Sequence, residues 1–501
     1  MPIDSLHPEY EISIEKWTRI RHVIEGEDAV KGAGRTYLPE LTGQSAPEYD
    51  AYKTRSLFFG AAKRTVLGLV GAVMRKEPHL EVPPALDDIV SDIGVDGESV
   101  TQFAMKLLDE VLSTGRVGVY VDAPPKDEGA EDEILPYLTI YYPENIINWK
   151  TVRLRGRNQL SMVVLKESIE AGDGDEYRRE EQTVYRVLKL VAVEEGEGED
   201  DEVHGSSHVF VVERWIKVEG RGVREEDQWV MLDSVIPKLQ GGSPLDYIPF
   251  TIVGVTGTGP KVEKSQLLDL VNVNLSHYRT SADLEHGRHF TALPTAWVAG
   301  FQVEDNAELK IGSATAWVAA DPSAKAGFLE FTGAGLGSLE SAMETKEKMM
   351  AVLGARLLEP QRPGVEAAES LRLRQSGEGS VLMNAALSVS EGIEIVLDWV
   401  ARWYGLLETE PVFKLNTDFN VAGIDSAILT SLMQALQSGG ISWDTWFYNL
   451  QRGELIPDGI DAEAERALIE TSIPMATPDS GAADEEFGEE EDEEVEESPQ
   501  S

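Results

Sequence analysis

Residues 366–404, EAAESLRLRQSGEGSVLMNAALSVSEGIEIVLDWVARWY, are the stretch of sequence that decides the fold. Apolar residues recur in it at alternating intervals of four and three, which predicts one narrow seam along a helix. The seam consists of Leu382, Ala386, Val389, Ile393, Val396, Val400 and Trp403. At ~1.5 Å per residue the helix would be roughly 55–60 Å long. A helix of that length needs neighbours along all of it, from its own chain or from other copies.

Two shorter helices with similar seams are predicted upstream of this one. The first covers about 262–287 and carries Leu268, Val271, Leu275, Tyr278 and Ala282. The second covers about 336–353, and Lys346 interrupts its seam of Leu336, Leu339, Met343, Met350 and Leu353. The segments LPTAWVAG, ATAWVAA and GFLEFTG between them predict short strands. Pro360 and Pro363 then separate the second helix from the long one, because proline interrupts a helix.

The N-terminal half of the chain predicts an α+β domain over residues 1–260. Helices are expected in residues 1–35, from Tyr52 to Arg75, and from Ser99 to Thr114, where Gly115 ends the helix. Strands rich in Val, Ile and Tyr follow, and they predict a mixed or antiparallel sheet. Their sequences are RVGVYVDAP, LPYLTIYY, INWKTVRLR, LSMVVLKES, TVYRVLKLVAVEE, SHVFVVERWIKVEG, QWVMLDSVIP and PFTIVGV.

The C-terminal part predicts a small helical domain and an acidic tail. Helices are expected at 424–438, 443–453 and 461–471. Residues 474–501 are expected to be disordered, because acidic and polar residues dominate them.

Charge and composition exclude several classes of function. The chain has 44 basic and 89 acidic residues, a net charge of −45, and no cysteine. The segment DEEFGEEEDEEVEE (484–497) holds 11 of the acids, which leaves −34 for the remainder. An acidic body argues against gripping nucleic acid by counterion release, but it would suit a wall that DNA passes without sticking. We expect no signal peptide and no membrane span, since no apolar run reaches 18 residues.

The best candidate for a nucleotide site is PFTIVGVTGTGPKVEKSQLLDLV, which reads as strand, glycine turn and helix. Gly254 and Gly259 have the spacing of glycines in a phosphate-binding loop. However, Pro260, Lys261 and Val262 stand where Gly-Lys-Ser/Thr is required, so the lysine is misplaced and the hydroxyl for magnesium is missing. An ordinary strand-to-helix turn is therefore favoured at 254–261.

Other chemistry-bearing residues do not assemble into a catalytic motif. His286 and His289, with His277 upstream, could share a helix face and bind metal, but no carboxylate or cysteine follows at ligand spacing. We expect no metal, no cofactor and no enzymatic activity. Arg356 and Arg362 lie in the proline-broken loop, where they are either solvated or in contact with a phosphate backbone.

Taken together, these features resemble the portal protein, or head-to-tail connector, of tailed bacteriophages. Within that class the chain resembles a portal-like family, common in prophages, that is defined only as a domain of unknown function. Three segments carry the resemblance: HPEYEISIEKWTRIRHVIEGEDAVK (7–31), LLDLVNVNLSHYRTSADLEHGRHFTALPTAWVAG (267–300) and KMMAVLGARLLEP (348–360). None of them is a catalytic signature, and the resemblance spans about residues 5–475.

The resemblance implies a portal-type fold with an α/β wing, a helical stem, a small α/β clip, a long kinked helix and a helical crown. Its divisions would be the wing at 1–260, stem helix 1 at 261–287, the clip at 288–333, stem helix 2 at 334–354, the tunnel loop at 355–366, the long wing helix at 367–404, the crown at 405–473 and the acidic tail at 474–501.

The function implied is a ring, usually of twelve copies, at one vertex of the capsid. Double-stranded DNA would pass through the ring during packaging and ejection. Expected partners are the large terminase, a head-completion or tail adaptor protein, and the major capsid and scaffolding proteins, without a membrane. The protein would belong to the virion and would pass through the host cytoplasm during assembly. Arg356 and Arg362 become candidate DNA contacts, while Trp297 and Trp317 in the clip are either docking residues or buried.

Two other classes of function remain open. One is a nucleotide-binding enzyme that uses the 254–261 turn. The other is a helical assembly adaptor that forms no channel.

Overall fold

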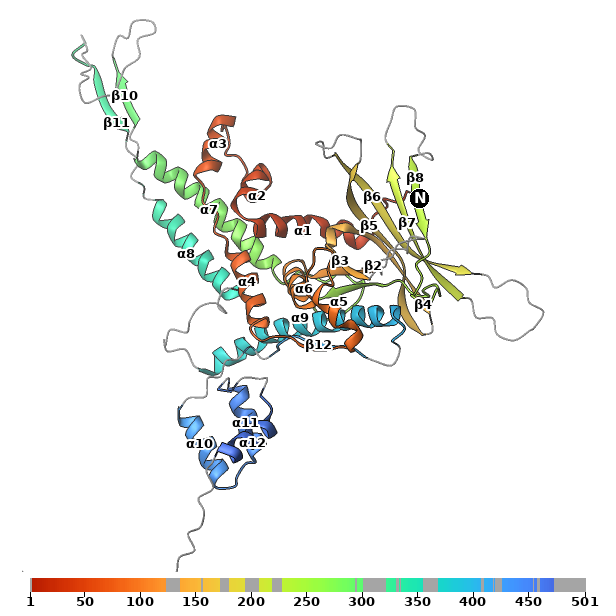
Figure 1. Ribbon diagram of the computed structural model, residues 1–501. Helices are drawn as coiled ribbons and strands as arrows, with labels where there is room; N and C mark the ends of the chain where they lie inside the picture. Colours follow the sequence, from red (N-terminus) through yellow and green to blue (C-terminus); the bar gives the residue numbers. More distant parts are fainter. Residues whose placement is uncertain are drawn as a thin grey trace, which may run out of the picture. The chain divides into compact units, whose positions relative to one another are not determined.

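The computed structural model divides the chain into two compact units, residues 1–419 and residues 420–501 (Figure 1). The residues that it describes are 2–122, 136–154, 156–171, 180–193, 207–218, 228–292, 295–300, 321–329, 333, 335–354, 368–406, 410–417, 419, 426–453, 455–456 and 460–472. Arg356, Arg362, Trp317 and the acidic tail therefore lie outside the described residues. No described helix is both long enough and apolar enough to cross a membrane.

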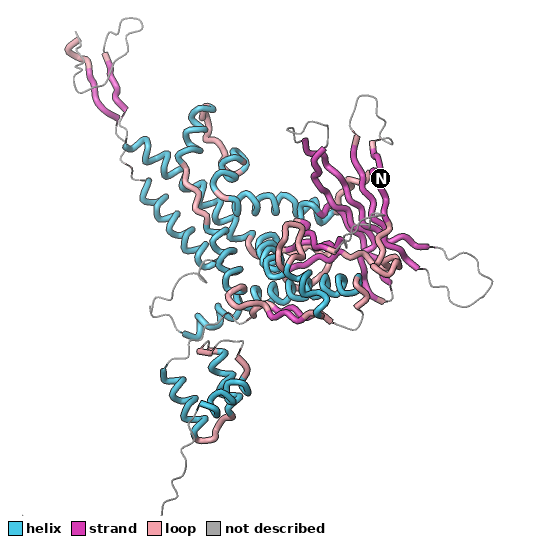
Figure 2. Tube along the Cα trace, in the orientation of Figure 1, coloured by secondary structure: helices cyan, strands magenta, loops and turns pink. Residues whose placement is uncertain are grey.

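The first unit mixes helices and sheets, so the predicted α+β class is confirmed (Figure 2). Its helices are α1 Pro8–Glu25, α2 Glu27–Gly32, α3 Ala46–Arg55, α4 Ala61–Val73, α5 Asp87–Ser91, α6 Val100–Thr114, α7 Leu268–Ala292, α8 Leu336–Leu353 and α9 Ala368–Trp403. Its strands are β1 His79–Glu81, β2 Arg116–Asp122, β3 Tyr137–Tyr141, β4 Ile146–Leu154, β5 Arg157–Ala171, β6 Glu180–Val193, β7 Ser207–Lys217, β8 Trp229–Val235, β9 Phe250–Gly254, β10 Thr295–Ala299, β11 Lys325–Leu329 and β12 Val412–Lys414.

The strands form four sheets, and every pair of named strands is antiparallel. The largest sheet has the order β4-β5-β6-β7-β8, so each strand lies beside its sequence neighbour. A second sheet has the order β3-β2-β9, which brings residues 250–254 back beside β2. The two-stranded sheets are β1-β12 and β10-β11. The eight strand segments predicted before residue 260 are confirmed.

Helix α6 begins and ends as its sequence predicts. The Ser99 hydroxyl accepts a hydrogen bond from the backbone amide of Gln102, and the side-chain oxygen of Gln102 accepts one from the backbone amide of Ser99. This reciprocal pair is a capping box. Gly115 ends the helix with φ +93°, a left-handed conformation that glycine adopts without steric penalty. The chain then turns directly into β2.

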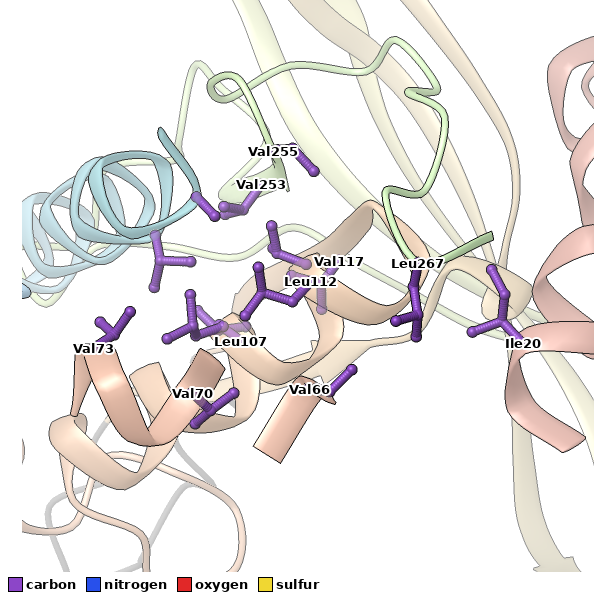
Figure 3. Close-up of a cluster of buried hydrophobic side chains, with 14 of the residues drawn as sticks. Ile20, Val66, Val70, Val73, Leu107, Leu112, Val117, Val253, Val255 and Leu267 are labelled. Carbon is purple, nitrogen blue, oxygen red and sulfur yellow. The ribbon is translucent and has the colours of Figure 1, made fainter. Parts of the chain in front are cut away.

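The core of the first unit lies where helices α4 and α9 pack against helix α6 and against the paired strands β2 and β9. Figure 3 shows Val70 and Leu107 among the aliphatic side chains that meet there. The α9 seam predicted from the sequence is buried from Leu382 to Val400. Gly392 lets α9 approach the sheet closely, since a Cβ added there would lie 2.5 Å from Val253 Cγ2.

A buried ion pair joins α1 to α6. The Arg21 guanidinium donates to both carboxylate oxygens of Glu110, with Nη1 2.7 Å from Oε2, and its Nε also donates to Glu144 at 2.8 Å. Glu110 is only 5% exposed. Burial raises the pKa of the Glu110 carboxyl, while the hydrogen bonds from Arg21 oppose that rise. The pair therefore compensates a charge in the interior.

Two predicted helices are interrupted, so the corresponding sequence predictions are wrong in detail. The predicted helix over 1–35 breaks at Gly26, which has φ +110° and separates α1 from α2. The predicted helix from Tyr52 to Arg75 is divided into α3 and α4. Hydrogen bonds to α7 replace helical ones here, because the Leu57 amide donates to Ser281 Oγ and the Asn274 side chain donates to the Phe59 carbonyl.

The second unit contains α10 Ser426–Gln437, α11 Trp443–Arg452 and α12 Ala462–Ser472, close to the predicted helices. The predicted start of the crown at 405 stays a prediction. Strand β12 pairs with β1 and buries Phe413, so residues up to 419 pack with the first unit.

Candidate functional site

Helices α7 and α8 form an antiparallel hairpin that carries the β10–β11 ribbon at one end (Figure 1). Helix α7 begins at Leu268 rather than at 262, because Ser265 Oγ donates to the Ser113 carbonyl and accepts from the Leu267 amide. These bonds hold the segment before the helix against the end of α6. The helix also continues to Ala292, beyond the predicted end at 287.

Polar contacts fix the two helices of the hairpin in register. Lys346 Nζ donates to the Ser276 carbonyl at 3.0 Å and also to Thr280 Oγ1. Burial, with a contribution from Arg279, lowers the pKa of Lys346. Nearer the ribbon, Arg288 on α7 pairs with Glu340 on α8 at 2.8 Å. The lysine that interrupts the apolar seam therefore belongs to the interface between the helices.

The outer side of α8 remains exposed. Met350 is the one α8 side chain that the described part of the chain buries. Near the C-terminal end of the helix, Met349, Val352 and Leu353 are each between 46% and 49% exposed. These three side chains form an apolar edge, which is a candidate interaction surface.

The β10–β11 ribbon is also incompletely packed. Trp297 lies opposite Gly327, with its ring against that glycine, and is 43% exposed. Phe328 is 57% exposed. A two-stranded ribbon is at best marginally stable alone in water. Of the two tryptophans predicted for docking, Trp297 is thus placed on an exposed ribbon.

The loop that carries Arg356 and Arg362 leaves the described structure beside α4. Gly354, the last described residue before it, would bring an added Cβ to 2.5 Å from Thr65 Cγ2 on α4 and 3.4 Å from Leu270 on α7. The neighbouring α4 residues Lys63 and Arg64 are exposed. In the sequence they are marked by a run, residues 51–76, that contains no acidic side chain.

The glycine turn at 254–261 is occupied by an acidic side chain. The Glu263 carboxylate accepts from the amides of Val255 and Thr256 at 3.0 and 3.2 Å, and from the Thr256 hydroxyl. Backbone amides of this kind would have to bind phosphate in a nucleotide site. A carboxylate in their place repels phosphate, so the turn does not fit a nucleotide.

We expect no measurable binding of a fluorescent ATP analogue to the wild-type protein, with or without magnesium, in a titration at low salt. Changing Lys261 to Ala is expected to alter nothing, because Lys261 is exposed and does not face a phosphate cradle. An affinity that is present in the wild type and disappears in Lys261→Ala would contradict this and restore the nucleotide hypothesis. Lys264→Ala, three residues along the chain, is the matched control.

The three histidines do not converge. His277 is buried and lies 3.3 Å from Glu347, whereas His286 packs against the rings of Tyr52 and Phe290. Burial lowers the pKa of His286. Among the described residues, no group of three or more histidine and carboxylate side chains could hold a metal ion.

Comparison with known proteins finds one family model and several structures. The model of a domain of unknown function, DUF4055, matches residues 266–404, which run from the start of α7 to the end of α9. No curated protein matches the chain.

The similar structures are components of gene transfer agent (GTA) particles. One, from the virion of a native particle, is 10% identical, with a TM-score of 0.36 over 88% of this chain and 98% of that chain. Another, from the neck of an empty particle computed with C6 symmetry, is 12% identical, with a TM-score of 0.35 over 82% and 90%. A third, from the neck of a native particle computed with C12 symmetry, is 10% identical, with a TM-score of 0.33 over 76% and 86%. Similarity at this level does not establish a shared fold.

Proposed function

We propose that the protein is a phage portal, a ring of about twelve copies at one capsid vertex through which double-stranded DNA is packaged and ejected. The observation that carries the proposal is the α7–α8 hairpin, whose second helix leaves Met349, Val352 and Leu353 exposed. A helix pair with an uncovered apolar edge is suited to packing against the next copy around an axis. Repetition of such a heterologous contact closes a ring when the rotation between copies is fixed.

The long helix and the charge of the chain support the same function. Helix α9 extends over 36 residues and packs against α6 and β9 in the core of the unit, while α7 of the hairpin packs against α1, α3 and α4. The net charge of −45 suits a wall along which DNA moves without adhering. In this proposal residues 1–260 form the wing, α7 and α8 the stem, the β10–β11 ribbon the clip, residues 355–366 the tunnel loop, and α10–α12 the crown.

The proposal gives each candidate site residue a role. Arg356 and Arg362 contact DNA from the tunnel loop. Trp297, with Trp317, provides the surface on which the large terminase docks during packaging and a head-completion or tail adaptor protein docks later. Capsid and scaffolding proteins surround the ring in the virion. The protein itself performs no catalysis, because the motor that moves the DNA is a separate docked protein.

A helical adaptor without a channel is the second candidate, and the exposed edge of α8 is compatible with it. The two candidates differ in the assembly that they predict. An adaptor forms small oligomers, whereas the portal forms a large closed ring.

The purified protein is expected to form a ring. Twelve copies of 55.1 kDa give about 660 kDa by light scattering, and negative-stain images of the same fraction should show a central hole. Val352→Asp is expected to shift the mass to small species, because it places a charge in the apolar edge of α8. Ile12→Asp on α1, at a residue that is 67% exposed, is the matched control and should leave the ring intact. Circular dichroism checks that both variants fold.

A protein that stays monomeric at micromolar concentration with capsid and scaffolding proteins present would overturn the portal proposal. A stable dimer or trimer under the same conditions would favour the adaptor.

A further inference from the structure

Residues 51–76 contain no acidic side chain, although the chain as a whole has twice as many acids as bases. The run AYKTRSLFFGAAKRTVLGLVGAVMRK holds six bases, and two of them, Lys63 and Arg64, are adjacent in α4. Within the run, Lys53 pairs with Asp50, whereas Lys63 and Arg64 place two adjacent positive charges at the start of α4. Their effect is confined to their surroundings, because charges more than about 8 Å away are screened at physiological salt.

Lys63 and Arg64 are exposed, and among the described residues neither makes a salt bridge. The Arg64 guanidinium lies 5.8 Å from the centre of the Phe59 ring. Lys63 acts on Asp109 only at a distance, where it partly offsets the rise that burial causes in the pKa of that carboxyl. Both cationic groups are therefore available to a ligand.

The positions of Lys63 and Arg64 do not stabilise helix α4. They lie in the first turn, where the helix dipole disfavours positive charge. The same helix has an open surface further along, since Leu67 is 58% exposed and a Cβ added at Gly71 would meet nothing within 4 Å. The exposed side of α4 thus combines two bases with a free approach.

The location of this surface points to its ligand. Thr65, the residue after Arg64, is the α4 contact of Gly354, from which the chain enters the 355–366 loop. Lys63 and Arg64 therefore stand next in sequence to the α4 residue that Gly354 contacts, and Gly354 is the last described residue before the segment that the proposed portal places around DNA. Duplex DNA carries one negative charge per ~1.7 Å of its axis. The Lys63 and Arg64 side chains therefore meet a phosphate at every position of the duplex as it moves along that axis.

We propose that Lys63 and Arg64 form a phosphate-binding surface for the duplex DNA that passes the ring. The inference rests on the proposed function and adds to it a contact on a folded helix, apart from the arginines of the loop. Lysine binds phosphate as a point charge, and arginine offers a fork of donors. The contact with phosphate does not depend on the DNA sequence, as a channel for DNA requires.

The test uses the full-length ring and a fluorescent 30-base-pair duplex in anisotropy titrations between 50 and 200 mM salt. Lys63→Gln/Arg64→Gln is expected to weaken binding about tenfold at 50 mM salt. The slope of log affinity against log salt should also fall by about one to two, since each lost phosphate contact contributes ~0.9. The matched control is Lys150→Gln/Arg153→Gln, which removes the same charge from two exposed positions of β4 and should change little.

Three results would overturn the inference. Equal weakening by both pairs would show only an effect of net charge. A wild-type ring of the expected mass that has no affinity for DNA at 50 mM salt would refute the phosphate surface while leaving the ring of the proposed function in place. Loss of the ring in Lys63→Gln/Arg64→Gln, with unchanged DNA affinity per chain, would make this surface an interface between copies.

Discussion

Changing Arg21 to Met is expected to lower the free energy of unfolding by about 3 kcal/mol, because it leaves a buried carboxylate without its partner. Glu110 is 5% exposed, and apart from Arg21 its carboxylate accepts from the Thr114 hydroxyl. Methionine retains most of the volume of the arginine stem, so the loss measures the missing charge rather than a cavity. Urea unfolding followed by circular dichroism gives the change as a shift of the midpoint.

The matched control is Arg35→Met, which breaks an ion pair of the same kind on the surface. Arg35 and Glu40 are 2.8 Å apart, but their side chains are 66% and 49% exposed. Exposed pairs contribute about 0–1 kcal/mol, so this variant should unfold almost as the wild type does. Equal midpoints for the two variants would show that the Arg21–Glu110 pair does not hold α1 against α6.

Changing Gly392 to Ala is expected to destabilise the protein by about 1–3 kcal/mol, although alanine is the better helix former. The added methyl group would lie 2.5 Å from Val253 Cγ2, so α9 must move away from β9 or Val253 must change its rotamer. Thermal unfolding of the first unit is the measurement, and a lower melting temperature is expected.

The same substitution at Gly71 in α4 is expected to change the stability of the protein in the opposite direction. Nothing lies within 4 Å of a Cβ at this position, so only helix propensity changes. We expect stabilisation by about 0.4–1 kcal/mol. If both variants were stabilised, the close contact between α9 and β9 would not limit the packing of the core.

The elements that the sequence predicts well are those whose periodicity alone specifies them. The α9 seam and the alternating strands of the large sheet are long, and their buried residues recur with one period. Helix α6 was predicted to its ends, because its capping residues act within one turn of the chain.

The elements that the sequence predicts poorly depend on contacts with distant segments. The break between α3 and α4 follows from hydrogen bonds of Leu57 and Phe59 to α7, more than 200 residues away. No local signal marks them. The burial of Arg116 has no local signal either. An arginine at the start of a strand such as β2 is ordinarily a surface residue, yet Arg116 is 1% exposed, and its guanidinium lies 4.5 Å from the centre of the Trp149 ring. Burial lowers its pKa to about 10.

The candidate site was predicted in part. The exposed position of Trp297 agrees with a docking role, which stays a prediction, as do the roles of Arg356, Arg362 and Trp317 outside the described residues. Lys63 and Arg64 were missed because their significance depends on the contact between Gly354 and Thr65, which joins segments that are far apart in the sequence.

The polar contacts between α7 and α8 hold the two helices of the hairpin against sliding along each other. Lys346 bonds to Ser276 and Thr280, and Arg288 bonds to Glu340 nearer the ribbon. Sliding of one helix along the other by a turn, ~5.4 Å, would break both contacts and leave the Lys346 ammonium without acceptors. The two helices are therefore expected to move as one body, from the Arg288–Glu340 pair to Gly354 at the end of α8.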